Sequence, residues 1–201
     1  MKVLVAFASA LLAAAPAFGV TIVYTTSLSG PNENPPVASP GIGVATVTVD
    51  TTAHTLRVQE TFSGLTSGTT ASHIHCCNPP PATSGVATMT PTFSGLPLGV
   101  TFGSMDQTFD TLATSTYNAP FVTSNGGTAA GAESALFAGI AAGNAYVNIH
   151  TTQNPGGEIR GFLTVAAVPE PETYALFLAG LASLGLVARR RQRRDADRLA
   201  G

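Results

Sequence analysis

Three of the four histidines stand in two strand-like segments where their side chains could meet and do chemistry. His73 and His75 flank Ile74, so a strand would point both imidazoles to the same face. His150 lies in the second segment, residues 145–151. Histidine is the commonest metal ligand, so a third imidazole from a neighbouring strand would complete a site for Zn²⁺ or Cu²⁺. The alternative is that the rings pack at a sheet edge and bond to nearby backbone. His54 lies beside a turn, where we expect it to be exposed to solvent.

The two cysteines, Cys76 and Cys77, follow His75 directly. Disulfides form and persist in oxidising compartments, which exported proteins reach. An intramolecular disulfide must join these neighbours, whose Cα atoms, about 3.8 Å apart, are closer than in most disulfides. We favour this vicinal disulfide. A bridge to a second chain and thiolate metal ligands beside the histidines are the alternatives.

Glu158 and Arg160 alternate in a segment that follows the turn at residues 154–157. A strand would place them on one face, and Arg160 is one of only two basic residues between positions 20 and 168. We therefore predict a buried, structural ion pair between them, because arginine is seldom buried without a partner. No Ser-His-Asp order, paired catalytic carboxylates or phosphate-binding loop stands out, so we expect no enzymatic activity.

The elements that would position these residues are short strands separated by glycine and proline turns. Residues 43–50 alternate apolar and polar side chains, which indicates a half-buried strand, and residues 54–62 continue as a hairpin. One helix is expected at 128–142, with Ala132, Leu136 and Ile140 on one face and a stop at Gly143. The pattern predicts a mainly β fold, an antiparallel β-sandwich with one short helix. Further strand candidates lie at residues 20–28, 71–75, 85–89, 107–112, 145–151 and 157–166.

The distribution of charge excludes one large class of function. The chain has nine basic and eleven acidic residues among 201, and the middle of the chain, 20–168, has seven acidic residues, two arginines and no lysine. Nucleic-acid binding needs clustered lysine and arginine, so a nucleic-acid partner is not expected. The length allows one domain of moderate size, 20–167, between two terminal segments.

The N-terminus has the organisation of a secretory signal peptide. Lys2 precedes an apolar stretch, and small residues stand at Ala17 and Gly19. We predict a signal peptide over residues 1–19, cleaved between Gly19 and Val20. An uncleaved membrane anchor is the alternative, although the apolar stretch is short for one.

The C-terminus combines three features in a fixed order: Pro169-Glu170-Pro171, an apolar stretch at 173–188, and an arginine cluster at 189–194. Sixteen helical residues rise roughly 24 Å, enough to span a membrane if the arginines reach the interface. The positive-inside rule would keep the arginines and the tail, 195–201, in the cytoplasm and the domain outside. We therefore predict a C-terminal transmembrane helix.

Residues 168–194 resemble the PEP-CTERM sorting signal of Gram-negative bacteria. This resemblance implies export across the inner membrane and processing by an exosortase near the Pro-Glu-Pro motif. It also implies delivery to the cell surface or the exopolysaccharide matrix. A plain C-terminal membrane anchor is the alternative.

Four segments in the middle of the chain carry motifs of one known family, in the order of that family: residues 30–37, 62–65, 71–75 and 145–161. Through these segments the middle of the chain resembles the CHRD domain, the module found in chordin and in bacterial proteins. The resemblance implies an extracellular β-sandwich and no defined reaction. The Cys76-Cys77 pair departs from the commoner glycine-containing sequence at that point.

Together these features predict an exported, non-catalytic binding protein of the cell surface or the exopolysaccharide matrix. The alternative is a secreted metal-binding protein, using Zn²⁺ or Cu²⁺ at His73, His75 and His150. A third interpretation treats the histidines, Glu158 and Arg160 only as polar supports of the core.

Overall fold

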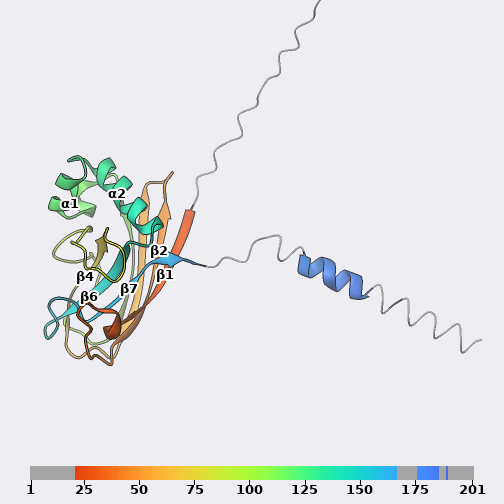
Figure 1. The fold of residues 1–201 in the computed structure, drawn as a ribbon, viewed down its shortest axis with the longest axis horizontal. Coiled ribbons are helices and arrows are strands. Elements are labelled where there is room, and N and C mark those ends of the chain that lie inside the picture. The colour runs from red at the N-terminus through yellow and green to blue at the C-terminus, as the bar shows by residue number, and fades with distance from the viewer. Residues whose placement is uncertain (1–20, 167–175, 186–188, 190–201) are drawn as a thin grey trace, which may run out of the picture. The chain divides into compact units, whose positions relative to one another are not determined.

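The computed structural model describes residues 21–166, 176–185 and 189 of the chain. The chain divides into two units, with the first ending at Val165, and each is described by itself. Figure 1 shows the first unit as a curved sheet with helices at one end. Its strands are β1 (Thr21–Ser29), β2 (Ile42–Asp50), β3 (Thr55–Ser63), β4 (Thr69–Cys76), β5 (Gly103–Asp110), β6 (Ala145–Thr151), β7 (Ile159–Phe162) and β8 (Thr164–Val165).

The strands form one continuous antiparallel sheet in the order β4-β6-β7-β1-β2-β3-β5, with β8 paired to β1. The alternation predicted for β2 is confirmed: Ala45, Val47 and Val49 are buried, while the threonines between them are not. Val47 faces Val58 of β3 across the ladder, so both place their side chains in the core. The mainly β, antiparallel prediction is therefore correct.

The sheet is curled and is not divided into the two separate sheets expected of a sandwich. β1 pairs with β2 along its whole length and also meets β7 at Ser29, opposite Arg160. This link joins β4-β6-β7 to β1-β2-β3-β5. Side chains from both wings, such as Val58 and Ile74, then fill one core. The physical reason is that one strand, β1, has a partner from each wing, so the hydrogen-bond ladder is never interrupted.

The helices cover one end of this sheet. The expected helix is confirmed as α2 (Ala129–Ala141): Ala132, Leu136 and Ile140 are buried, and the Thr128 hydroxyl accepts from the Gly131 N–H at 3.1 Å. Gly143, with φ of 72°, follows its end as predicted. A second helix, α1 (Ala119–Ser124), was not predicted; it lies in a loop-rich region and begins with proline in its first turn. Two short 3₁₀ helices, η1 (Gly30–Asn32) and η2 (Thr114–Thr116), complete the described elements of the first unit.

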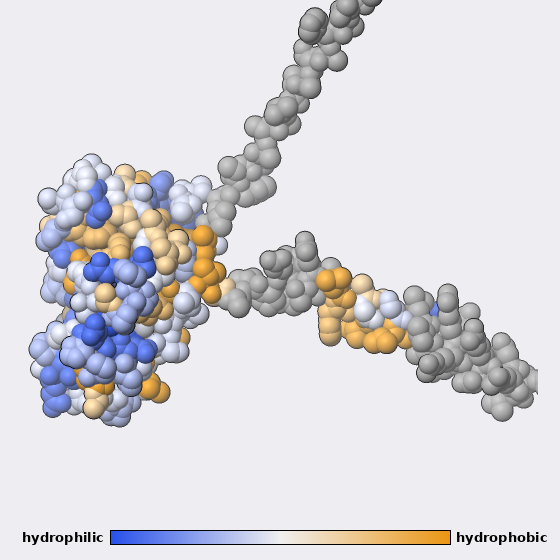
Figure 2. All heavy atoms as spheres, viewed as in Figure 1, coloured by the Kyte–Doolittle hydropathy of each residue, from blue (hydrophilic) through white to orange (hydrophobic). Residues whose placement is uncertain are grey.

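The terminal predictions fall mostly outside the described residues. These include the signal peptide with its Gly19–Val20 cleavage site, the motif Pro169-Glu170-Pro171, and the tail. Residues 176–185 of the expected transmembrane segment are helical, and Figure 2 shows this stretch as predominantly hydrophobic. Within the described ranges, no helix has both the length and the apolar character needed to cross a membrane.

Candidate metal centre

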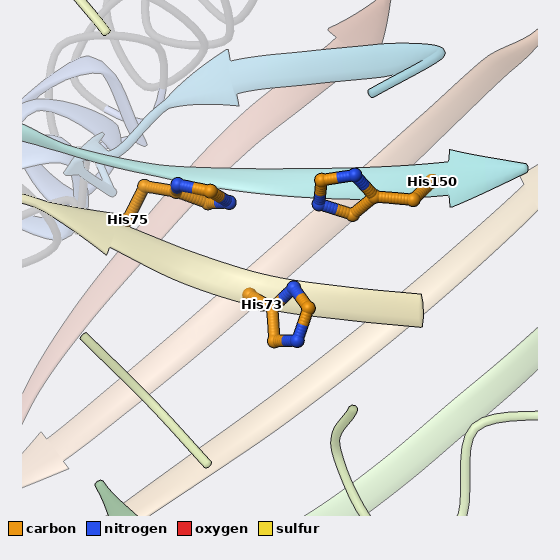
Figure 3. Close-up of side chains that lie close together, drawn as sticks. All are labelled: His73, His75 and His150. Atoms are coloured by element: carbon orange, nitrogen blue, oxygen red, sulfur yellow. The ribbon is translucent and has the colours of Figure 1, made fainter. Parts of the chain in front are cut away.

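The three histidines predicted to meet do so on the face of the β4-β6 pair that is turned away from the hydrophobic core, where all three are buried. The two strands are antiparallel neighbours, with Ala71 opposite His150 and His73 opposite Asn148. Ile74, between the first two histidines, is fully buried in the core, so the imidazoles lie on the other face. Figure 3 shows His73 and His75 on one strand and His150 on its neighbour.

The imidazoles approach closely enough to share one ion. One ring nitrogen from each of His73, His75 and His150 lies within 4.8 Å of the others. A tetrahedral zinc ion at about 2.0–2.1 Å from each nitrogen needs them about 3.3 Å apart. The three nitrogens therefore lie within about 1.5 Å of the spacing that a shared zinc ion requires.

Each histidine uses one ring nitrogen to bond a backbone carbonyl. His73 Nε2 lies 2.8 Å from the carbonyl oxygen of Pro91. His75 Nδ1 lies 2.9 Å from the carbonyl oxygen of Ser84, and His150 Nδ1 lies 3.0 Å from that of Pro155. A carbonyl can only accept, so these nitrogens carry the protons and the opposite nitrogens carry lone pairs. This is the outer-shell arrangement that orients histidines in metal sites.

The remaining nitrogens are buried and unpaired. His73 Nδ1, His75 Nε2 and His150 Nε2 have no hydrogen-bond partner among the described residues. Such atoms are rare in folded proteins, and a missing ion or water is a usual explanation. Three such nitrogens close together, each with a free lone pair, suit a metal cation.

Burial keeps the three rings neutral. It lowers the pKa of His73 to about 4, with the positive charge of His150 adding to the effect and the bond to Pro91 opposing it. Burial likewise lowers the pKa of His75 to about 4 and lowers the pKa of His150. Neutral imidazole is the form that binds metal, so protons compete weakly at this site.

This gives a prediction for pH. We expect the apparent dissociation constant for Zn²⁺ to change by less than about tenfold between pH 7.5 and pH 5.5, and to rise steeply only towards pH 4. Three histidines with an ordinary pKa near 6.5 would instead lose about 1,000-fold at pH 5.5, since each would be about nine-tenths protonated. Competition titration with a chromophoric chelator at a series of pH values measures the difference. A large loss by pH 5.5 would contradict the arrangement.

Tyr146, which the sequence analysis did not single out, supports His75. The two rings stack at 4.9 Å between centroids, nearly parallel. The Tyr146 hydroxyl accepts from the Ser84 N–H at 3.1 Å, and the Ser84 carbonyl is the partner of His75. Position 146 shares the alternation of 148 and 150, and that signal could have identified it.

The predicted ion pair between Glu158 and Arg160 is wrong. Within the described ranges, the carboxylate near Arg160 is Glu33, whose Oε2 lies 3.7 Å from Arg160 Nε. The guanidinium also donates to the carbonyls of Asn32 and Pro81, and its Cζ lies 4.7 Å from the centre of the Tyr146 ring. Two loops distant in sequence, one after β1 and one after β4, supply Glu33, Asn32 and Pro81, and no local pattern indicates this.

Glu158 has a different role. Its carboxylate accepts from the hydroxyls of Ser39, Thr66 and Thr151 and from the Thr66 N–H. Burial alone would raise the pKa of Glu158, but these hydrogen bonds outweigh it and lower the pKa. Glu158 is therefore an ionised anchor that ties the 151–158 turn to two other loops.

His54, the fourth histidine, lies outside the cluster. His54 was expected to be solvated, but its Nδ1 lies 2.9 Å from a Glu133 carboxylate oxygen, and its side chain is 41% exposed.

Cys76 and Cys77 are joined as a vicinal disulfide, with Cys76 buried and Cys77 exposed. His75 and Cys76 are adjacent in β4 and point to opposite faces, so the sulfurs do not join the histidine cluster.

Comparison with known proteins matches two parts of the chain. The CHRD domain model matches residues 24–163, and the PEP-CTERM protein-sorting motif matches residues 167–192. No curated protein and no solved structure matches the chain. The first match includes all three histidines of the cluster, and the second follows it directly.

Proposed function

The chain belongs to the CHRD domain family, and from this we propose that it is an exported protein whose CHRD domain binds a transition metal ion. The PEP-CTERM motif supports export and processing by an exosortase. Membrane anchoring by the C-terminal segment, followed by residence at the cell surface or in the exopolysaccharide matrix, is part of the proposal. So is a role in binding and not in catalysis.

The observation that carries the proposal is the set of three unpaired lone pairs. His73, His75 and His150 each hold a proton on the ring nitrogen that bonds a carbonyl. The other nitrogen of each ring is buried, and the three rings lie close together. If these rings were only polar supports, each would satisfy both nitrogens or turn one to solvent. An all-imidazole set suits Cu²⁺ and Zn²⁺ better than Mg²⁺ or Ca²⁺, which prefer oxygen ligands.

The test is metal content and stability of the full chain, expressed for export and purified with detergent. We expect about one Cu²⁺ or Zn²⁺ per chain by elemental analysis after reconstitution and desalting. Free metal at about 100 times the dissociation constant should add about 2.7 kcal/mol to the free energy of unfolding. Mg²⁺ at the same concentration is the control. Substoichiometric metal and an unchanged melting temperature would overturn the proposal.

A further inference from the structure

We propose that a hollow beside the disulfide binds a neutral sugar unit of a polysaccharide. The hollow has a volume of ≈ 420 Å³ and lies between the end of β4 and α1, with Cys77 and Phe121 among its lining residues. This size is within the usual range for small-ligand sites. None of the three clustered histidines lines it, so the inference is independent of the metal site and gives the expected exopolysaccharide partner a place on the domain.

The hollow offers nothing to a charged ligand. None of its lining residues is acidic or basic. The surrounding sequence is equally neutral, because residues 61–105 and 111–132 contain no Asp, Glu, Lys or Arg. A carboxylated or phosphorylated ligand would lose its hydration there without a compensating charge.

Three asparagines in the lining present the same polar group. The amide nitrogens of Asn78, Asn118 and Asn125 donate to the carbonyls of Thr83, Val86 and Phe121, at 2.8, 3.2 and 2.8 Å. Their amide oxygens accept no hydrogen bond from any described residue, and an amide oxygen has two lone pairs. The ligand must therefore bring hydrogen-bond donors without charge, which hydroxyl groups do.

Apolar side chains complete the lining of the hollow. The Cys76–Cys77 disulfide, Pro120 and Phe121 line it together with the amides. A sugar ring has C–H groups on its faces and hydroxyls around its rim, so it matches a lining that combines apolar side chains with hydrogen-bond acceptors. A purely apolar ligand would leave the amide oxygens unpaired.

The disulfide is held in place by α2. A Cβ atom at Gly139 would overlap Cys76 Sγ and lie 2.7 Å from Cys77 Sγ, so both sulfurs rest against the helix backbone. Only glycine leaves that space. The disulfide is thus fixed before a ligand arrives, which lowers the free-energy cost of binding.

A matched pair of variants tests the hollow. Ser124 lines it and is exposed, so Ser124→Tyr fills it without removing a described hydrogen bond. Thr123, the next residue, lines a separate hollow with Met89 and Thr90, so Thr123→Tyr adds the same ring elsewhere. The full chain and both variants are applied to an array of neutral and carboxylated oligosaccharides, with folding checked by thermal melting.

We expect neutral hexose oligosaccharides to bind, Ser124→Tyr to weaken binding at least about tenfold, and Thr123→Tyr to stay within about twofold. The proposal is overturned if no neutral oligosaccharide binds, if carboxylated ones are preferred, or if both variants bind alike. A chelator control separates this test from the metal proposal. Glycan binding that survives metal removal upholds the hollow alone, whereas bound metal without glycan binding refutes the hollow alone.

Discussion

Replacing His150 with alanine is expected to weaken Zn²⁺ or Cu²⁺ binding by more than about 100-fold. Loss of an outer-shell partner alone costs about 10–100-fold in metal affinity, so loss of a ligand costs more. His150 is the one histidine of the cluster that β6 contributes, and without it β4 offers only two nitrogens. Isothermal titration of the metal-free protein with ZnCl₂ measures the loss.

His54→Ala is the matched control for this variant. His54 is a histidine of the same domain that pairs with Glu133 and takes no part in the cluster. We expect its removal to leave the dissociation constant within about twofold. Thermal melting of both variants shows whether they remain folded. Unchanged affinity in folded His150→Ala would mean that the metal binds elsewhere.

Replacing Arg160 with methionine is expected to lower the free energy of unfolding by about 3 kcal/mol at pH 7, because one partner of a buried pair is removed. The Arg160 side chain is 1% exposed and holds Glu33, Asn32 and Pro81 against β7. Burial raises the pKa of Glu33 to about 7, with Arg160 opposing that rise, so Glu33 can take up a proton when the arginine is lost. This uptake keeps the cost near the lower end of the range for buried pairs. Urea denaturation followed by circular dichroism measures it.

The sign of the pH dependence follows from the raised pKa of Glu33. A carboxyl group with a raised pKa binds more protons in the folded state than in the unfolded state, so it destabilises the fold as pH rises from about 4.5 towards its folded value. Arg160 lowers the pKa of Glu33, so without Arg160 this pKa rises further and the pH range over which Glu33 destabilises the fold extends above pH 7. We therefore expect the difference between Arg160→Met and the original chain to grow between pH 7 and pH 8.5.

Arg57→Met provides the control for the same chemical change. Arg57 forms an ion pair with Asp106 in which both side chains are nearly half exposed. Exposed ion pairs contribute little to stability, so this variant should lose far less stability than Arg160→Met. Similar losses in the two variants would contradict the structural role assigned to Arg160.

The predictions made from local patterns were largely correct. Alternation in β2 and the i, i+4, i+8 spacing in α2 gave the right elements, because both reflect the backbone period of a single segment. The same reasoning put His73 and His75 on one face. The two-sheet sandwich and the pair of Glu158 with Arg160 were wrong, because both depend on which distant segment lies alongside.

Local sequence patterns were enough to predict the sorting motif, the β-rich class and the three residues of the histidine cluster. The sorting motif and the strand periods are local properties, and they can be read without the fold. The fold was needed to show that Ala71 faces His150 and that Glu33 reaches Arg160. It was also needed to show that Ser84, Pro91 and Pro155 supply the carbonyls that bond the histidines. Strand register and loop placement are set by packing one core from the whole chain, so no segment carries that information alone.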